Sequence, residues 1–152
     1  MNKPRILVLV LGLFGFSMSA MAAPDCAPLA SLNGTYSLFD EQGQPFSQNS
    51  TLKLYANGCQ LVGLGGEYDM MYFDAPNTAN EGKVVSAEIL KSANPNTALE
   101  FRVQLQQIET KQVLSRALFR LLTSNDLIIV TDVYDKKGTL LKHVIVIGKK
   151  QL

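Results

Sequence analysis

The chain has 152 residues, with 14 lysines and arginines against 13 aspartates and glutamates, which gives a formal net charge of +1 at pH 7. This near-neutral balance argues against nucleic acid and against an anionic membrane surface as partners. The length fits one domain with a core large enough to fold alone.

Residues 1–22 are predicted to be a secretory signal peptide that is cleaved near Ala22. Two basic residues precede an unbroken apolar run at 6–16, which is shorter than the roughly 20 residues of a membrane-spanning helix. Ala20 and Ala22 then supply the small-x-small pattern that signal peptidase recognises. The mature domain is expected to span 23–152, in the periplasm or secreted, and not to be an integral membrane protein; an uncleaved anchor is the alternative.

The two cysteines, Cys26 and Cys59, are expected to form one disulfide, because an exported chain meets an oxidising compartment. A closed loop of this length predicts roughly 3 to 4 kcal/mol of stabilisation in the chain-entropy treatment. The alternative, a redox-active pair, is disfavoured because the spacing is wide and no C-x-x-C motif is present.

The first predicted strands lie early in the mature region, at 32–39, 51–56 and 59–62. Asn57-Gly58 separates the second strand from the third and is a preferred pair for a two-residue hairpin turn. Such a turn would set Ala56 opposite Cys59 and would keep the disulfide on the core side of the hairpin.

The later strands are predicted from the alternation of apolar and polar residues, at 68–73, 83–90, 98–107, 127–134 and 139–147. Residues 74–82 are expected to form a polar loop. Residues 111–122 fit a helix as well as a strand, and we favour a strand because the flanking segments are strands joined by short turns.

These elements predict an all-β fold, an antiparallel up-and-down meander that closes into a barrel of about 8–10 strands with one disulfide. Closure is favoured because it removes exposed strand edges. Residues 127–130 and 144–147 are apolar on both faces, so each of these strands is expected to be packed on both faces. A closed barrel with a lumen and a packed sandwich both remain open at this point.

Three features resemble the calycin superfamily of lipocalins and fatty-acid-binding proteins. Gly34-Thr35-Tyr36 resembles the lipocalin Gly-x-Trp signature, the meander resembles the calycin strand plan over most of 32–149, and the strand start at 124–129 with its glycine-turned hairpin resembles the last strands of such barrels. The resemblance implies a cup-shaped barrel that binds a small apolar ligand. Lipocalins tend to place a last-strand arginine over the tryptophan, and the cations offered here are Lys142 and Lys149.

Candidate ligand contacts follow from the strand plan and from an apolar patch at 70–73 beside a glycine-rich bend. Methionine and aromatic side chains often line the mouth of a ligand site, although an ordinary core strand is the alternative. The predicted ligand-binding residues are Tyr36, Met70, Tyr72, Phe101 and His143.

No catalytic or metal site is predicted. His143 is the single histidine, and catalysis would require an orienting carboxylate, for which Asp132 on the facing strand is the candidate, together with a nucleophile. One histidine and two oxidised cysteines do not supply the usual zinc ligands. Acidic residues at 67–81, with Asn77 and Asn80, could hold calcium, but their spacing matches no known loop. We therefore expect no enzyme activity and no cofactor.

The leading hypothesis is an exported, periplasmic β-barrel that binds a small apolar or amphipathic ligand. The alternative is a non-enzymatic protein–protein interaction module of the cell envelope, such as an assembly factor or an inhibitor. It draws on the uneven charge, about −6 over 23–82 and +5 over 83–152, which would steer a charged envelope protein partner if the two halves formed separate faces.

Overall fold

The computed structural model of the chain describes residues 22–47, 50–64, 69–79 and 82–152. The predicted signal peptide lies outside these residues except for Ala22. The described part contains one 3-10 helix and ten strands: η1 (Ala27–Leu32), β1 (Gly34–Phe39), β2 (Thr51–Asn57), β3 (Gln60–Val62), β4 (Met70–Tyr72), β5 (Asn77–Ala79), β6 (Lys83–Leu90), β7 (Thr97–Gln107), β8 (Val113–Leu122), β9 (Asp126–Tyr134) and β10 (Leu140–Lys150).

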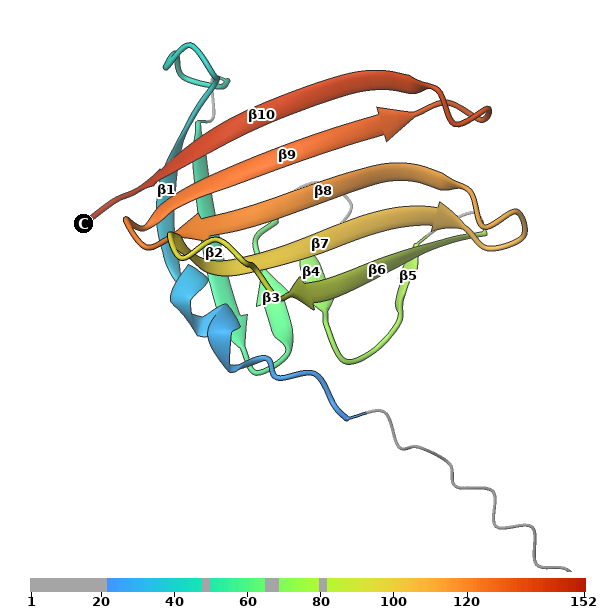
Figure 1. The fold of residues 1–152 in the computed structure, drawn as a ribbon, viewed down its shortest axis with the longest axis horizontal. Coiled ribbons are helices and arrows are strands. Elements are labelled where there is room, and N and C mark those ends of the chain that lie inside the picture. The colour runs from blue at the N-terminus through green and yellow to red at the C-terminus, as the bar shows by residue number, and fades with distance from the viewer. Residues whose placement is uncertain (1–21, 48–49, 65–68, 80–81) are drawn as a thin grey trace, which may run out of the picture.

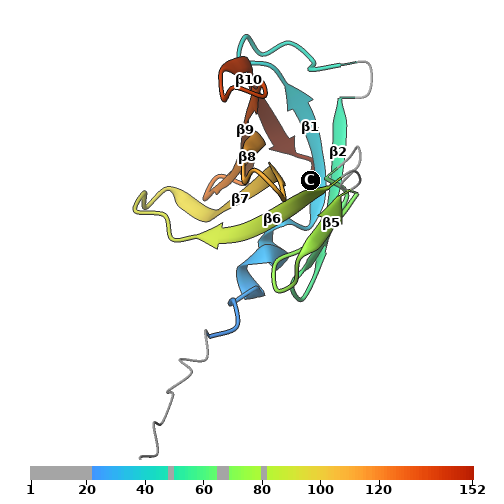
Figure 2. The ribbon, with the colours of Figure 1, turned by 90° about the vertical axis from the view of Figure 1, so that its right-hand side faces the viewer.

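The strands form an antiparallel up-and-down meander that curves into a nearly closed barrel (Figure 1), as the sequence predicts. The order in the sheet is β4-β3-β2-β1-β10-β9-β8-β7-β6-β5, so neighbours in the sheet are also neighbours in the chain except where β1 pairs with β10. Figure 2 shows the sheet wrapping around the interior, with η1 at one end. The packed-sandwich alternative is therefore wrong.

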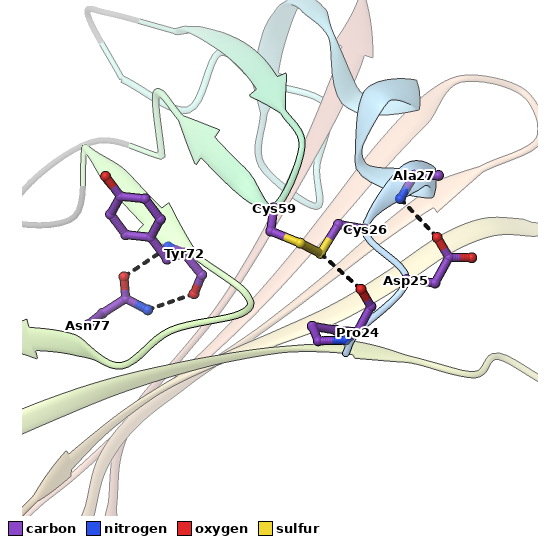
Figure 3. Close-up of a disulfide and its surroundings, with 7 residues drawn as sticks. All are labelled: Pro24, Asp25, Cys26, Ala27, Cys59, Tyr72 and Asn77. Atoms are coloured by element: carbon purple, nitrogen blue, oxygen red, sulfur yellow. Dashed lines mark hydrogen bonds between the residues drawn. A yellow bond between two sulfur atoms is a disulfide. The ribbon is translucent and has the colours of Figure 1, made fainter. Parts of the chain in front are cut away.

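The barrel is interrupted between β4 and β5, which form no strand pairing among the described residues. The side chain of Asn77 bridges this seam: the Tyr72 N–H donates to Asn77 Oδ1 at 2.8 Å, and Asn77 Nδ2 donates to the Tyr72 carbonyl at 2.8 Å (Figure 3). Strand β5 lies inside the predicted loop 74–82, so that prediction was wrong at 77–79. Its three residues are too few and too polar to show an apolar alternation.

Residues 113–122 form strand β8, which confirms the strand interpretation of this ambiguous segment and makes the helical alternative wrong. Phe119 lies opposite Phe101 of β7 and opposite Ile129 of β9. Because side chains alternate between faces along a strand, the same register turns Arg116 and Leu118 outward. The pairing of β8 on both sides decides between the two periods that its sequence allows.

The β2–β3 hairpin has a different register from the predicted one. Ala56 pairs with Leu61 and Asn57 pairs with Gln60, so the two turn residues are Gly58 and Cys59. The prediction that Ala56 lies opposite Cys59 was wrong. The shift is two residues, and it leaves the inward face unchanged because the side-chain period of a strand is two. In the turn, Cys59 is unpaired with β2, its carbonyl accepts from the Phe73 N–H at 2.9 Å, and its side chain reaches the N-terminal segment.

Helix η1 closes one end of the barrel. Leu29 and Leu32 are fully buried, and the Tyr36 hydroxyl donates to the Leu32 carbonyl at 2.9 Å. The predicted disulfide is confirmed: Cys26 and Cys59, with Cα atoms 5.0 Å apart, join the start of η1 to the β2–β3 turn (Figure 3). The N-terminal segment is thus held against the sheet covalently and by apolar packing.

A lysine of the last strand lies over Tyr36. It is Lys150, whose Nζ is 5.8 Å from the ring centroid and donates to the Ser31 carbonyl at 3.3 Å. The expectation that Lys142 or Lys149 takes this position was wrong. Adjacent strand residues point to opposite faces, so Lys149 pairs with a carboxylate of β9 instead. Lys142 is exposed and stands eight residues before Lys150, about 26 Å along the strand.

Candidate ligand cavity

A cavity of about 270 Å³ lies against the inner faces of β6, β7, β8 and β9. It is lined by Leu64, Val85, Val103, Leu105, Ser115, Ala117, Phe119, Ile129 and Thr131. Seven of these nine residues are apolar, the other two carry hydroxyl groups, and none is charged. An apolar concavity with a few polar groups is the usual form of a small-molecule site.

The cavity ends at a cluster of aromatic rings. Phe119 stacks on Phe101 with the ring centroids 4.5 Å apart and the planes nearly parallel, and Phe73 meets Phe101 edge-on at 5.4 Å. Phe101 is fully buried. The next inward-facing residue of β8 is Ala117, whose small side chain leaves space unfilled. The cavity exists because the inward residues of β8 become smaller away from η1.

Ser115 and Thr131 are the two polar lining residues. Ala117 lies opposite Thr131 in the β8–β9 register, and Ser115 is two residues further along the same face of β8. They are therefore diagonal neighbours, at a spacing of about 7 to 8 Å between backbones. Neither hydroxyl has a hydrogen-bond partner among the residues that the structure describes. Both are available to a bound molecule.

Two of the predicted ligand contacts, Tyr36 and Phe101, point into the barrel but do not line the cavity. Both are fully buried, Phe101 behind Phe119 and Tyr36 at the end that η1 closes. Burial raises the pKa of the Tyr36 hydroxyl, since the phenolate would be desolvated there. The two residues shape the floor and the closed end of the barrel.

Met70 and Tyr72 lie on the outer face of β4. Their side chains are 48% and 41% exposed, and Tyr72 donates from its hydroxyl to the Met70 sulfur at 3.2 Å. Met71 between them is fully buried and faces the core. The alternation along a strand therefore divides the predicted apolar patch, and the structure does not bring Met70 or Tyr72 to the cavity.

His143 lies on the outer face of β10, directly opposite Asp132 of β9. Its Nδ1 is 2.6 Å from Asp132 Oδ1, and the two side chains are 47% and 27% exposed. Arg116 of β8 lies opposite Asp132 on the same outer row. The predicted histidine–carboxylate contact is present, but on the side of the sheet away from the cavity.

The predicted acidic cluster does not form a metal site in the part of the chain that the structure describes. No group of three or more histidine, cysteine, aspartate or glutamate residues is placed there to hold a metal ion. Asp69 and Asp74 are exposed, whereas Glu67, Asn80 and Glu81 lie outside the described residues.

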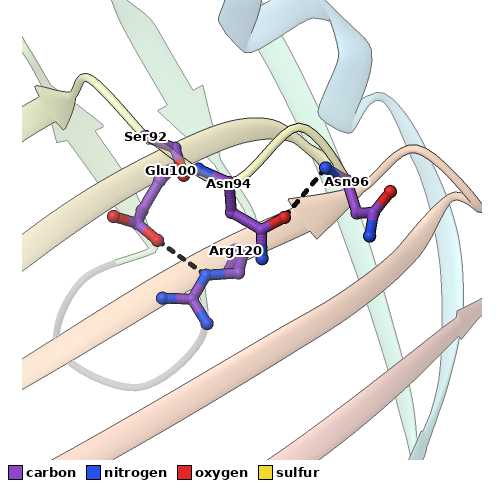
Figure 4. Close-up of polar contacts among 5 residues, drawn as sticks. All are labelled: Ser92, Asn94, Asn96, Glu100 and Arg120. Atoms are coloured by element: carbon purple, nitrogen blue, oxygen red, sulfur yellow. Dashed lines mark hydrogen bonds and ion pairs between the residues drawn. The ribbon is translucent and has the colours of Figure 1, made fainter.

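The outer face of β6 to β8 carries cross-strand ion pairs. Glu100 pairs with Arg120 at 2.6 Å (Figure 4), and Glu88 pairs with Arg102 at 2.6 Å. All four residues belong to the basic half of the chain, so these contacts do not neutralise the acidic half. The Glu88–Arg102 pair is exposed, and such pairs contribute about 0 to 1 kcal/mol. In the other pair, Glu100 is partly buried, and both pairs lie away from the cavity.

The predicted ligand contacts do not include the residues that line the cavity, although the sequence carries a signal for them. Val103 and Leu105 stand on the predicted inward face of 98–107, and the inward positions of the neighbouring strands carry Ser115, Ala117 and Thr131. Small or hydroxyl residues at consecutive inward positions among large apolar ones indicate a gap in the core. That signal depends on knowing the register between strands.

None of the helices formed by the described residues has the length and apolar character needed to cross a membrane. A scan against protein-family models, a search of curated proteins and a search of solved structures give no match for this chain. The site must therefore be interpreted from its own geometry.

Proposed function

We propose that this protein is a binding protein that takes up a small apolar or amphipathic ligand in the cavity beside β6 to β9. The observation that carries the proposal is the apolar lining of a hollow of about 270 Å³, close to the lower end of the roughly 300 to 1,000 Å³ of small-molecule sites. The proposed role is binding without catalysis, and it agrees with the calycin-like barrel that the sequence resembles.

The position of the cavity supports this role. Ser115 of the lining stands six residues from Leu121, which is buried near η1, so the two ends of this strand face are separated by about 20 Å. One end is sealed by η1, Tyr36 and the disulfide. The arrangement is that of a cup with a closed floor and a ligand space above it.

The proposed site of action is the periplasm or the extracellular space. The Cys26–Cys59 disulfide persists in an oxidising compartment, and the predicted signal peptide 1–22 would deliver the chain there. Export also gives the protein access to amphipathic molecules of the cell envelope.

Native mass spectrometry of the protein purified from its own host tests the proposal. We expect a reproducible extra mass that is lost on denaturation. Ala117→Phe should abolish this mass or weaken ligand binding by about tenfold or more, because the added ring fills the cavity, and a tenfold loss corresponds to about 1.4 kcal/mol. The matched control is Ser86→Phe, which places the same ring on the exposed outer face. Equal binding by both variants would contradict the proposal.

A second candidate function is a non-enzymatic interaction with an envelope protein. The observation that favours it is the apolar outer face of β9 and β10, where Ile128 lies opposite Ile147 and Val130 opposite Ile145. Apolar residues gathered on an outer face are typical of interaction surfaces. A bare mass in every native preparation would favour this function over ligand uptake.

A further inference from the structure

The polar part of the cavity consists of hydroxyl groups alone. Ser115 and Thr131 line it, and no lysine, arginine or histidine does so. Arg116, the neighbour of Ser115 in β8, is exposed on the outer face, whereas Lys83 of β6 stands on the same inward row as Val85 but does not line the cavity. A ligand in this cavity therefore meets hydrogen-bonding groups without a counter-charge.

This lining discriminates between head groups by charge. An ionised carboxylate loses its hydration on entering an apolar cavity, and without a paired cation the cost is several kcal/mol. A neutral hydroxyl or carbonyl loses less, and Ser115 and Thr131 can each donate to it or accept from it. Both hydroxyls lack a protein partner among the described residues, so a ligand would complete their hydrogen bonds rather than compete for them.

The size of the cavity limits the apolar part of the ligand. A volume of about 270 Å³ is close to the lower end of the roughly 300 to 1,000 Å³ of small-molecule sites. The polar end stands at Ser115 and the aromatic floor at Phe119, four residues along the same strand, which is a distance of about 13 Å. These dimensions suit an unbranched chain or a single ring system of about ten non-hydrogen atoms.

We propose that the cavity selects an uncharged, medium-length amphipathic molecule with one hydroxyl or carbonyl group, held by Ser115 and Thr131 with its apolar tail on Phe119. This inference rests on the proposed binding function and specifies its ligand class. It excludes free carboxylic acids at neutral pH as the preferred ligands.

The test compares three molecules of the same chain length by isothermal titration calorimetry at about pH 8, where carboxylic acids are ionised. These are 1-nonanol, methyl nonanoate and nonanoate. We expect 1-nonanol and methyl nonanoate to bind at least about tenfold more tightly than nonanoate. Thr131→Val and Ser115→Ala should each weaken 1-nonanol binding by about two- to tenfold, the range for loss of one hydrogen bond. Ser86→Ala removes an exposed hydroxyl from the outer face of β6 and should leave binding unchanged.

The outcomes separate this inference from the function on which it rests. Binding of nonanoate as tightly as 1-nonanol, or unchanged binding in both hydroxyl variants, would overturn the inference; loss of binding in Ala117→Phe would still uphold the cavity as the site. If none of the three molecules binds while the native protein carries an extra mass that Ala117→Phe removes, the ligand class is wrong and the binding function stands. No binding together with a bare native mass would reject both.

Discussion

At the scale of single residues, Tyr36 links the sealed end of the barrel to its sheet. Its hydroxyl donates to the Leu32 carbonyl, and its ring packs beneath the Lys150 ammonium at 5.8 Å. Gly148, two residues before Lys150, makes room for this ring, because an added Cβ there would lie 3.3 Å from Tyr36 Cβ. One side chain thus joins η1, β1 and β10.

Tyr36 should make the stability of the protein depend on pH in alkali. Burial raises its pKa above 10.0 in the folded state, so the unfolded chain releases this proton first and the free energy of unfolding falls as pH rises from about 10 to the folded value. The slope is at most about 1.4 kcal/mol per pH unit for one group. Denaturant titrations at several pH values should show that Tyr36→Phe removes this part of the fall. Tyr55→Phe is the matched control, since Tyr55 is exposed.

Tyr36→Phe should also cost about 1 kcal/mol at neutral pH, because it removes a buried hydrogen bond and leaves the Leu32 carbonyl without its hydroxyl partner. An alkaline fall of equal size in Tyr36→Phe and the unmodified protein would show that other groups cause it.

At the scale of elements, long strands with regular alternation could be predicted from the sequence, and short or irregular ones could not. The inward residues of β7, such as Phe101, follow from period 2 alone. Strand β5 has three residues and no apolar alternation, so it reads as a loop. The β2–β3 register depends on which residues form the turn, and both choices put Leu54 and Leu61 inside, so hydrophobicity does not distinguish them.

The same limit explains the candidate site. The sequence indicates a strand at 68–73 but does not say which of Met70 and Met71 faces inward, because both are apolar. The cavity is a property of four strands in register, with Ala117 beside Thr131, and the small inward residues of one strand indicate it only when that register is known. Identity of the apolar residues was predictable; the unfilled space between them was not.

The disulfide and η1 act as one element, and their contribution can be measured. Replacing Cys26 and Cys59 by serine should lower the free energy of unfolding by roughly 3 to 4 kcal/mol, because the cross-link restricts the unfolded chain. Denaturant unfolding monitored by tyrosine fluorescence is the measurement, and reduction of the unmodified protein should give a similar loss. If Leu29 and Leu32 alone hold η1 against the sheet in this variant, its circular dichroism spectrum should keep the signal of the β-strands. An unchanged unfolding midpoint would contradict the stabilising role.

At the scale of the whole molecule, export predicts two covalent properties of the mature protein: a new N-terminus and a disulfide. The mature protein should begin at Ala23, and its intact mass should be two hydrogens lower than that of the same chain with both thiols free. Mass spectrometry of protein from the periplasmic fraction, with and without reduction, measures both properties. Full-length chain in the membrane fraction would show instead that residues 1–22 remain as an anchor.

The pairing of β1 with β10 has a consequence for the rate of folding. Gln151 donates to Ser37 across 114 residues of sequence, whereas each of the other pairings joins strands that follow one another in the chain. Closing so long a loop costs chain entropy before the contacts between β1 and β10 can form. A large sequence separation between contacting residues slows folding. Barrel closure should therefore be the late step, after the local hairpins have formed. A circular permutant whose new ends lie in the β4–β5 seam would make every pairing local, and its folding would no longer wait for the two ends of the chain to meet.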